Sequence, residues 1–119
     1  MSNKTVVNFE EKHHILEVDG VQYEIPQRTA ALEKLIRERD AKINDYTEYE
    51  SNMKMLEILF GEDKAKQMFP DGEQTNLDKL EMCTKVAIAL YMSGHIDMMA
   101  KNTYEELLGI YEPGAKKAK

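Results

Sequence analysis

Three histidines are the first candidates for metal or acid–base chemistry in this chain: His13, His14 and His95. Zinc sites use His and Cys ligands at short, recurring spacings. Because His13 and His14 are adjacent, an extended segment points them to opposite faces, and they do not ligate one ion together. His95 follows Gly94, and we interpret it as a loop residue rather than a catalytic base. The histidines therefore predict no metal site.

The carboxylates are numerous but form no recognisable site. Glu62 and Asp63 begin a short helix, where the helix dipole favours negative charge. Asp71 and Glu73 lie in a turn that lacks the alternating acids, central Gly and closing Glu of a calcium-binding loop. The sequence shows no Gly-rich phosphate loop, Ser-His-Asp set or Cys-His pair. We expect a protein that is not an enzyme and that has no cofactor.

Cys83 is the single cysteine, so no disulfide forms within the chain. It lies within an apolar helical pattern, which predicts a small buried side chain. The sequence places no base beside it, as a reactive thiol requires.

Methionine is the more informative residue type. The chain holds eight methionines, and four of them, Met82, Met92, Met98 and Met99, lie close together. Surfaces rich in Met adapt to varied apolar partners because the side chain is flexible and polarizable. Met53 and Met82 also fit gap-filling in a core, whereas Met92, Met98 and Met99 adjoin a break in the helical pattern. Core packing and partner binding both stay open for this cluster.

Length and charge limit the classes of protein that fit. A chain of 119 residues, 42% of them hydrophobic, supports one domain with a modest core. The net charge is −6, although Lys116, Lys117 and Lys119 crowd into the last four positions. An acidic body repels a phosphate backbone, so we expect no nucleic-acid partner. No apolar run approaches the roughly 20 residues of a membrane span, and we find no signal peptide. We therefore expect a cytoplasmic protein without membrane contact.

The N-terminal third predicts a β-hairpin. Residues 14–18 and 21–25 are separated by Asp19-Gly20, a dipeptide typical of a two-residue type I′ turn. That turn sets a register that pairs Val18 with Val21, Leu16 with Tyr23, and His14 with Ile25. One face is then apolar, and its residues are Leu16, Val18, Val21, Tyr23 and Ile25. Because a lone hairpin is marginal in water, we expect this face to dock on the helices or on another copy of the chain, in which case it would form a homo-oligomer interface. Val6, Val7 and Phe9 are candidates for a third strand.

Four or five helices are expected after the hairpin. Apolar periodicity and turn residues place them at 29–45, 47–60, 62–68, 76–92 and, as the fifth, 96–110. The fold class is therefore α+β, mostly α. We expect one domain over residues 1–112, with a hairpin region at 6–25, a helical region at 29–111 and a disordered basic tail at 113–119.

Capping-box spacing predicts helix starts at Thr47, with Glu50, and at Thr75, with Asp78. Gly61 is expected to end the helix that begins at Thr47.

Two helices have unusual faces. The helix at 29–45 carries a thin apolar stripe because Arg39 stands where an apolar residue is expected. The helix at 76–92 is apolar more than halfway round, which predicts that it is the central helix.

Excess apolar surface on the helices predicts that the chain binds another protein. The faces within 53–60 and 76–92, with the clustered methionines, carry more apolar side chains than a small core hides. The expected partner-binding residues are Met55, Ile58, Leu59, Met82, Val86, Leu90, Met92, Met98 and Met99.

The order of elements and two short segments resemble the tail assembly chaperones of long-tailed phages and prophages of Gram-positive bacteria. The residues that carry the resemblance are Leu59-Phe60-Gly61-Glu62, Ala65 and Phe69-Pro70-Asp71-Gly72, followed by Leu77, Leu80 and Val86. The likeness covers roughly residues 14–92. It implies a protein of the host cytoplasm that coats the helical tape measure protein, helps to recruit tail tube subunits and oligomerises through its N-terminal region.

Two other classes stay open. One is a small virion structural protein, such as a head–tail connector or tail completion component, which mature particles would contain and a chaperone would not. The other is a helical adaptor unrelated to phage. A DNA-binding adaptor needs a basic helix face, but Arg28, Lys34, Arg37 and Arg39 are interleaved with acids.

Overall fold

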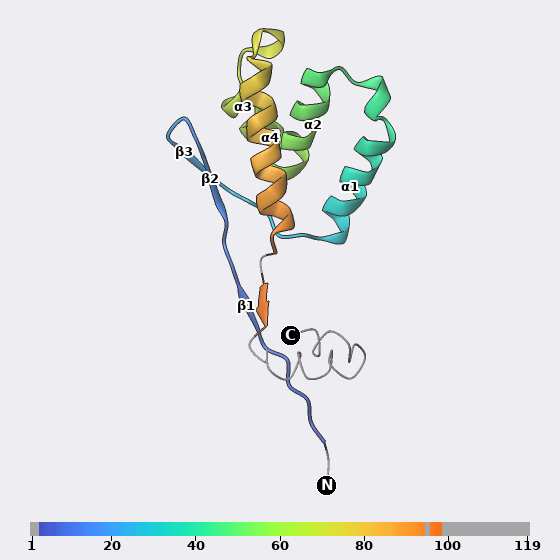
Figure 1. Cartoon of the computed structure of the whole chain (residues 1–119), viewed down its shortest axis with the longest axis vertical. Coiled ribbons are helices and arrows are strands. Elements are labelled where there is room, and N and C mark those ends of the chain that lie inside the picture. Colours follow the sequence, from blue (N-terminus) through green and yellow to red (C-terminus); the bar gives the residue numbers. More distant parts are fainter. Residues whose placement is uncertain (1–2, 95, 99–119) are drawn as a thin grey trace, which may run out of the picture. The chain divides into compact units, whose positions relative to one another are not determined.

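A computed structural model of the chain describes residues 3–94 and 96–98. These residues fall into two compact units, residues 13–94 and, separately, residues 3–12 with 96–98. The larger unit holds a β-hairpin followed by four helices (Figure 1). The expected fold class, α+β and mostly α, is confirmed. The single domain over 1–112 stays a prediction, and the tail at 113–119 lies outside the described residues.

The hairpin consists of β2 (Ile15–Val18) and β3 (Val21–Glu24). Its two turn residues, Asp19 and Gly20, have φ angles of 49° and 83°. Positive φ at both positions is what a two-residue type I′ turn requires. The predicted register is confirmed by the pairs Leu16–Tyr23 and Val18–Val21 and by the hydrogen bond that Ile25 N–H donates to the His14 carbonyl at 2.9 Å.

The inner face of the hairpin is buried within the chain itself. Leu16, Tyr23 and Ile25 belong to the same core cluster as side chains of the helices. The rings of Tyr23 and Phe60 meet edge to face, with centroids 5.9 Å apart. Such aromatic pairs add to the free energy gained from area burial alone. The core residues, all 9% exposed or less, are Leu16, Tyr23, Ile25, Met53, Met55, Leu56, Leu59, Ala65, Met68, Leu80, Ala87 and Tyr91.

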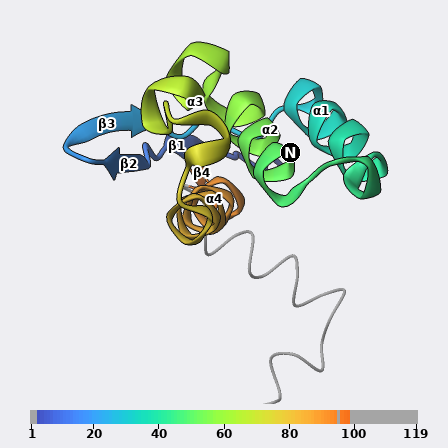
Figure 2. The same cartoon turned by 90° about the horizontal axis from the view of Figure 1, so that it is seen from above.

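The helices are α1 (Ala30–Ala41), α2 (Glu48–Phe60), α3 (Glu62–Met68) and α4 (Leu77–Met92). α2 packs against each of the other three helices. The prediction that the helix at 76–92 is central is therefore wrong, because only one stripe of α4 is covered while α2 is covered on several sides. Figures 1 and 2 show the hairpin on one side of the α2–α4 pair and α1 on the other.

The ends of α2 follow the sequence prediction. Thr47 Oγ1 accepts a hydrogen bond from Glu50 N–H at 3.1 Å, and the Glu50 carboxylate accepts one from Thr47 N–H at 2.9 Å. This reciprocal pair is the expected capping box. At the other end Gly61, with φ 93°, donates its N–H to the Glu57 carbonyl at 2.8 Å. The predicted helix stop at Gly61 is confirmed.

The start of α4 differs from the prediction. Its N-cap is Asn76, whose side chain accepts a hydrogen bond from Lys79 N–H at 3.0 Å. Thr75 is buried, and its hydroxyl has no hydrogen-bond partner among the described residues. The predicted capping box of Thr75 with Asp78 is therefore wrong, because the helix begins one residue later and Asn76 satisfies its first amides.

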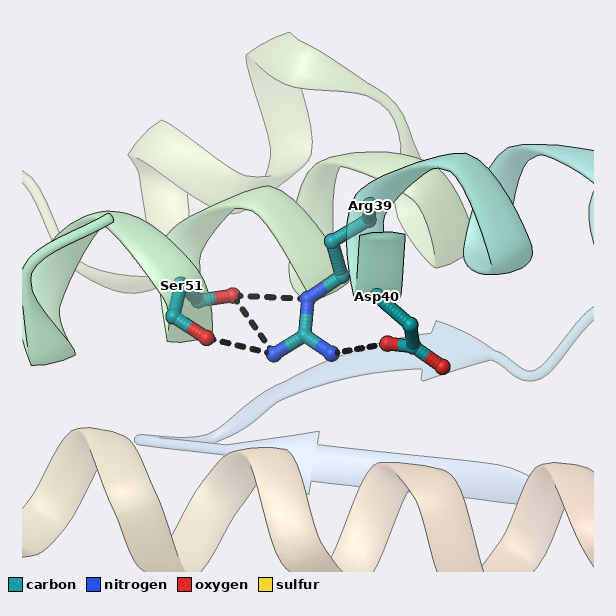
Figure 3. A network of polar contacts seen from close by, with 3 residues as sticks. All are labelled: Arg39, Asp40 and Ser51. Atoms are coloured by element: carbon teal, nitrogen blue, oxygen red, sulfur yellow. Dashed lines mark hydrogen bonds and ion pairs between the residues drawn. The ribbon is translucent and has the colours of Figure 1, made fainter. Parts of the chain in front are cut away.

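Arg39 joins α1 to α2 (Figure 3). Its guanidinium donates two hydrogen bonds to the Ser51 carbonyl, at 3.1 and 3.0 Å, and one to the Ser51 hydroxyl at 2.7 Å. A further nitrogen contacts the Asp40 carboxylate at 2.7 Å. The side chain is only 11% exposed. Arg39 therefore occupies the apolar stripe because its stem packs there while its charged fork is satisfied by α2.

Tyr91 joins α4 to α1. Its hydroxyl donates a 2.7 Å hydrogen bond to the Glu33 carboxylate, which also contacts Arg28 at 3.4 Å. Burial, and then the bond to Glu33, raise the pKa of Tyr91 to about 12. The bonds from Tyr91 and Arg28 lower the pKa of Glu33. These polar links matter because none of the residues of α1, all of them described, is fully buried.

The smaller unit pairs β1 (Phe9–Glu11) with β4 (Ile96–Met98) as an antiparallel ladder, with Phe9 opposite Met98. Residues 96–98 were expected to begin a fifth helix. They form a strand instead, because the order Ile-Asp-Met alternates with the period of a strand and finds a ladder partner. Residues 99–110 of that expected helix lie outside the described residues. The candidate third strand exists from Phe9 onward, but it pairs with β4 rather than with the hairpin.

Replacing Arg39 tests the link between α1 and α2. Arg39→Ala is expected to lower the free energy of unfolding by about 2 kcal/mol, because it removes hydrogen bonds made by a charged group. Arg39→Met keeps the apolar stem and should recover part of that loss. Urea unfolding followed by circular dichroism measures both. The exposed neighbour Arg37→Ala is the control and should stay within about 0.5 kcal/mol of the parent. Equal losses for Arg37→Ala and Arg39→Ala would contradict this role.

Replacing Tyr91 tests the link between α4 and α1. Because the folded-state pKa of Glu33 is lowered, this bond contributes stability above the carboxyl's ordinary pKa of 4.5 and loses it as pH falls through the folded value. Tyr91→Phe should therefore be less stable than the parent at neutral pH, and the difference should narrow in acid. Tyr49→Phe is the control, since no described residue forms a hydrogen bond with the Tyr49 hydroxyl. A difference in unfolding free energy between Tyr91→Phe and the parent that stays constant with pH would argue against the hydrogen bond from Tyr91 to Glu33.

Candidate functional site

An open groove of about 600 Å³ lies between the hairpin and α4. Its walls come from β2 with the following turn, from α4, and from Phe69 between α3 and α4. No described residue of β3 lines it. The lining residues are Leu16, Glu17, Val18, Asp19, Phe69, Asp78, Lys79, Met82, Cys83 and Val86. The arrangement is an apolar trough with charged groups at its rim.

The helical wall of the groove is a second stripe of α4. Leu80, Thr84, Ala87 and Tyr91 form the first stripe and are buried in the core. The groove stripe includes Met82 and Val86, four residues apart and thus on one helix face. Met82 is 66% exposed and Val86 is 40% exposed. α4 therefore uses one apolar stripe for folding and leaves the other open.

The opposite wall follows from the hairpin turn. The Asp19-Gly20 turn fixes the register, so Leu16 and Val18 both point toward the helices. Leu16 is buried, while Val18, one position before the turn, is half-buried. Phe69 is also half-buried, and its N–H donates to the Ala65 carbonyl at 3.1 Å, which ends α3. These side chains complete the apolar lining.

Electrostatics in the groove are set by carboxylates. Glu17 and Asp19 stand on the hairpin wall, and Asp78 stands beside Lys79 on the helical wall; all four are exposed. The pKa of the half-buried Cys83 thiol responds to one of these negative charges. Burial raises its pKa, and the negative charge of Asp19 raises it further. The thiol is therefore held in its protonated form, which is not how a nucleophilic cysteine is arranged.

Two other hollows are less apolar. One, of about 420 Å³ between α1 and α2, mixes acids and bases in equal number. Its lining is Leu35, Glu38, Arg39, Lys42, Tyr46, Lys54, Glu57, Ile58 and Glu62. Another, of about 430 Å³, lies by the start of α2 and is lined by Thr47, Glu48, Tyr49, Glu50, Glu73 and Leu77. Among the described residues, no group of three or more His, Cys, Asp or Glu is placed to hold a metal ion.

The structure separates the residues that were expected to bind a partner. Met82 and Val86 line the groove, whereas Ile58 lines the hollow between α1 and α2. Met55 and Leu59 are 4% and 5% exposed, so the expectation that they face a partner is corrected: they are core side chains.

The remaining expected partner residues lie elsewhere. Leu90 is half-buried, and Met92 is 57% exposed at the end of α4; neither lines the groove. Met98 belongs to β4 in the smaller unit. Met99 lies outside the described residues.

The hairpin face expected to join copies of the chain is largely occupied. Leu16, Tyr23 and Ile25 are buried by the chain's own helices. Val18 is half-buried and Val21 is 41% exposed. The inner face is therefore corrected from an oligomerisation surface to a part of the core, because covering it is what makes the hairpin stable.

Sequence reasoning missed Phe69, Cys83 and the rim acids as site residues. Cys83 was expected to be simply buried, and Phe69 was assigned to a turn. One signal was present: Asp78, Met82 and Val86 recur every four residues, on the side of the helix away from Leu80. No feature of the sequence predicted that this stripe would face β2, because that arrangement depends on how the hairpin docks.

Comparison with known proteins identifies no relative of this chain. No protein-family model matches the chain. No curated protein and no solved structure matches it either. None of the described helices is both long and apolar enough to cross a bilayer.

Neutralising Asp19 tests the electrostatics of the groove. Asn-Gly supports the same turn as Asp-Gly, so Asp19→Asn keeps the hairpin. Removing the negative charge should lower the pKa of Cys83, and alkylation of this single thiol should become faster at a fixed pH below that pKa. The rate of iodoacetamide labelling, followed against pH by mass spectrometry, measures this. Asp63→Asn on α3 is the control. An unchanged pH profile in Asp19→Asn would contradict the inferred field.

Proposed function

We propose that this protein is a tail assembly chaperone of the long-tailed phage type, which holds apolar segments of a helical tape measure protein in the host cytoplasm. The observation that carries the proposal is the open apolar groove between β2 and α4. Grooves of this kind accept one face of an amphipathic helix through anchors at i, i+4 and i+7.

The exposed apolar side chains supply the driving force. Covering the open parts of Met82 and Val86 would contribute about 2–3 kcal/mol, scaled from the free energy of burying whole side chains. Association costs on the order of 4–15 kcal/mol in lost freedom. These two side chains alone do not offset that cost, so one groove binds weakly at most, which suits a chaperone that must release its client.

Two of the residues that carry the family resemblance line the groove, and the others lie in the core or elsewhere in the helical region. Gly61 joins α2 to α3, and its φ of 93° lets the chain turn sharply there. Phe69 and Val86 line the groove itself. The family resemblance and the groove therefore share Phe69 and Val86, and both support a client-binding role for these residues.

Several weak grooves act together if copies of the chain associate, since each further contact becomes intramolecular. The inner hairpin face is covered, so association would use another surface. The outer edges of the two-stranded hairpin are the candidates, because each edge of a two-stranded sheet is unpaired.

Mass spectrometry of mature phage particles separates this proposal from a virion structural role. A chaperone should be absent from particles and present in the infected-cell lysate. Its presence in particles at stoichiometric amounts would instead favour a connector or tail completion protein.

A charge placed in the groove should weaken client binding. Val86→Glu removes apolar contact and puts a carboxylate against the client, which is expected to weaken binding about tenfold or more. The measurement is the soluble fraction of the tape measure protein when the two are co-expressed. Leu77→Glu is the matched control, because Leu77 is on the same helix, is 41% exposed against 40% for Val86, and lies outside the groove. Equal solubility with both variants would argue against the groove as the client site.

A further inference from the structure

We propose that the segment held in the groove is a basic amphipathic helix, with Lys or Arg residues flanking its apolar anchors on both sides. This inference rests on the proposed function and adds the chemistry of the client. It comes from the charges at the rim and from the length of the groove.

The rim carries three acids and one base. Glu17 and Asp19 lie on the hairpin wall, and Asp78 and Lys79 lie on the helical wall. Among the described residues, no ion pair joins any of the three carboxylates to a base, whereas exposed acids elsewhere on α3 and α4, such as Glu62 and Glu81, do have lysine partners. The rim acids are therefore available to a partner's charges.

The negative charge of Asp19 also affects the pKa of the thiol inside the groove. Burial raises the pKa of Cys83, and the charge of Asp19 raises it further. The same charge contributes, after burial and Cys83, to the raised pKa of Tyr23, which is a core residue and not part of the groove lining. Asp19 is also one of the lining residues, so a cation bound in the groove would experience its field.

The length of the groove fits two turns of helix. Asp78 and Val86 mark the ends of the helical wall and are eight residues apart, which is about 12 Å along the axis. Anchors at i, i+4 and i+7 of a client helix span a similar distance. Residues beside those anchors then lie against the two walls, and acids stand on both walls.

An excess of acid also lines the hollow at the start of α2, where Glu48, Glu50 and Glu73 have no base among the lining residues, but that hollow is less apolar than the groove. The hollow between α1 and α2 holds equal numbers of acids and bases, so it offers no net charge to a partner. Complementary charge at a rim chiefly sets partner choice and association rate, while apolar contact supplies most of the affinity. The rim therefore selects among apolar helices rather than binding cations alone.

The test uses two synthetic helical peptides that share one apolar stripe and differ only in their flanking residues, which are Lys in one and Glu in the other. Binding is read from protection of Cys83, the single cysteine of the chain, against alkylation. We expect the Lys peptide to protect at about tenfold lower concentration than the Glu peptide in low salt, since each exposed pair changes binding about 1.4-fold to fivefold. The difference should shrink in about 0.5 M NaCl.

A pair of charge reversals separates the rim from the overall acidity of the protein. Asp78→Lys should weaken binding of the Lys peptide about threefold to tenfold and strengthen binding of the Glu peptide. Asp63→Lys is the matched control, because Asp63 also lies in the first turn of a helix but is not a lining residue of the groove. Circular dichroism and the unfolding midpoint verify that both variants fold.

The outcomes distinguish this inference from the function on which it rests. If both peptides protect Cys83 equally, the groove binds helices and the basic-client inference is wrong. If Asp63→Lys and Asp78→Lys weaken the Lys peptide equally, the attraction is to net charge and the inference is again wrong. If neither peptide protects Cys83 at any concentration, the proposed function fails and takes the inference with it.

Discussion

Coverage of the apolar hairpin face is the constraint on which the rest of the structure depends. A two-stranded hairpin alone is marginal in water, so β2 and β3 need an apolar surface to pack against. The helices cover the base of that face, where Tyr23 and Ile25 are buried, but near the turn Val18 is half-buried and Val21 is 41% exposed. The groove lies beside the part that the helices leave open. The packing that stabilises the fold thereby creates the candidate site.

Polar contacts position the helices that apolar burial does not fix. α1 contributes no fully buried residue, although Leu32 and Ile36 pack against the core. It is held further by the bond of its Arg39 to Ser51 of α2 and by its Glu33 carboxylate, which accepts a hydrogen bond from Tyr91 of α4. Tyr91 lies on the core stripe of the same helix whose other stripe lines the groove. Fixing α4 on one side leaves Met82 and Val86 in place on the other side, where they stay exposed among the described residues. A pre-positioned apolar wall loses less freedom on binding than a mobile one.

Local features of the fold were predictable because they depend on neighbouring residues. The Asp19-Gly20 turn, the hairpin register, the capping box of Thr47 and the stop at Gly61 each follow from interactions within a few positions. Two errors lie where distant parts compete: residues 96–98 pair with β1 instead of starting a helix, and α2 takes the central place expected for α4. Both outcomes depend on contacts that sequence spacing does not encode. The third error is local, because Asn76 and Thr75 are neighbouring cap residues and Asn76 is the one that accepts from Lys79.

The hairpin, the helical segments, the acidic charge and an apolar surplus on α4 follow from the amino-acid sequence, because turn chemistry, periodicity and composition are local quantities. Which apolar residues are surplus depends on how the elements pack. Met55 and Leu59 are covered while Met82 and Val86 stay open, although all four are apolar residues on helices of similar character. The physical reason is that burial is a property of docked surfaces. α2 packs against α4, and how far the hairpin reaches toward the other side of α4 is set by the packing of the whole core.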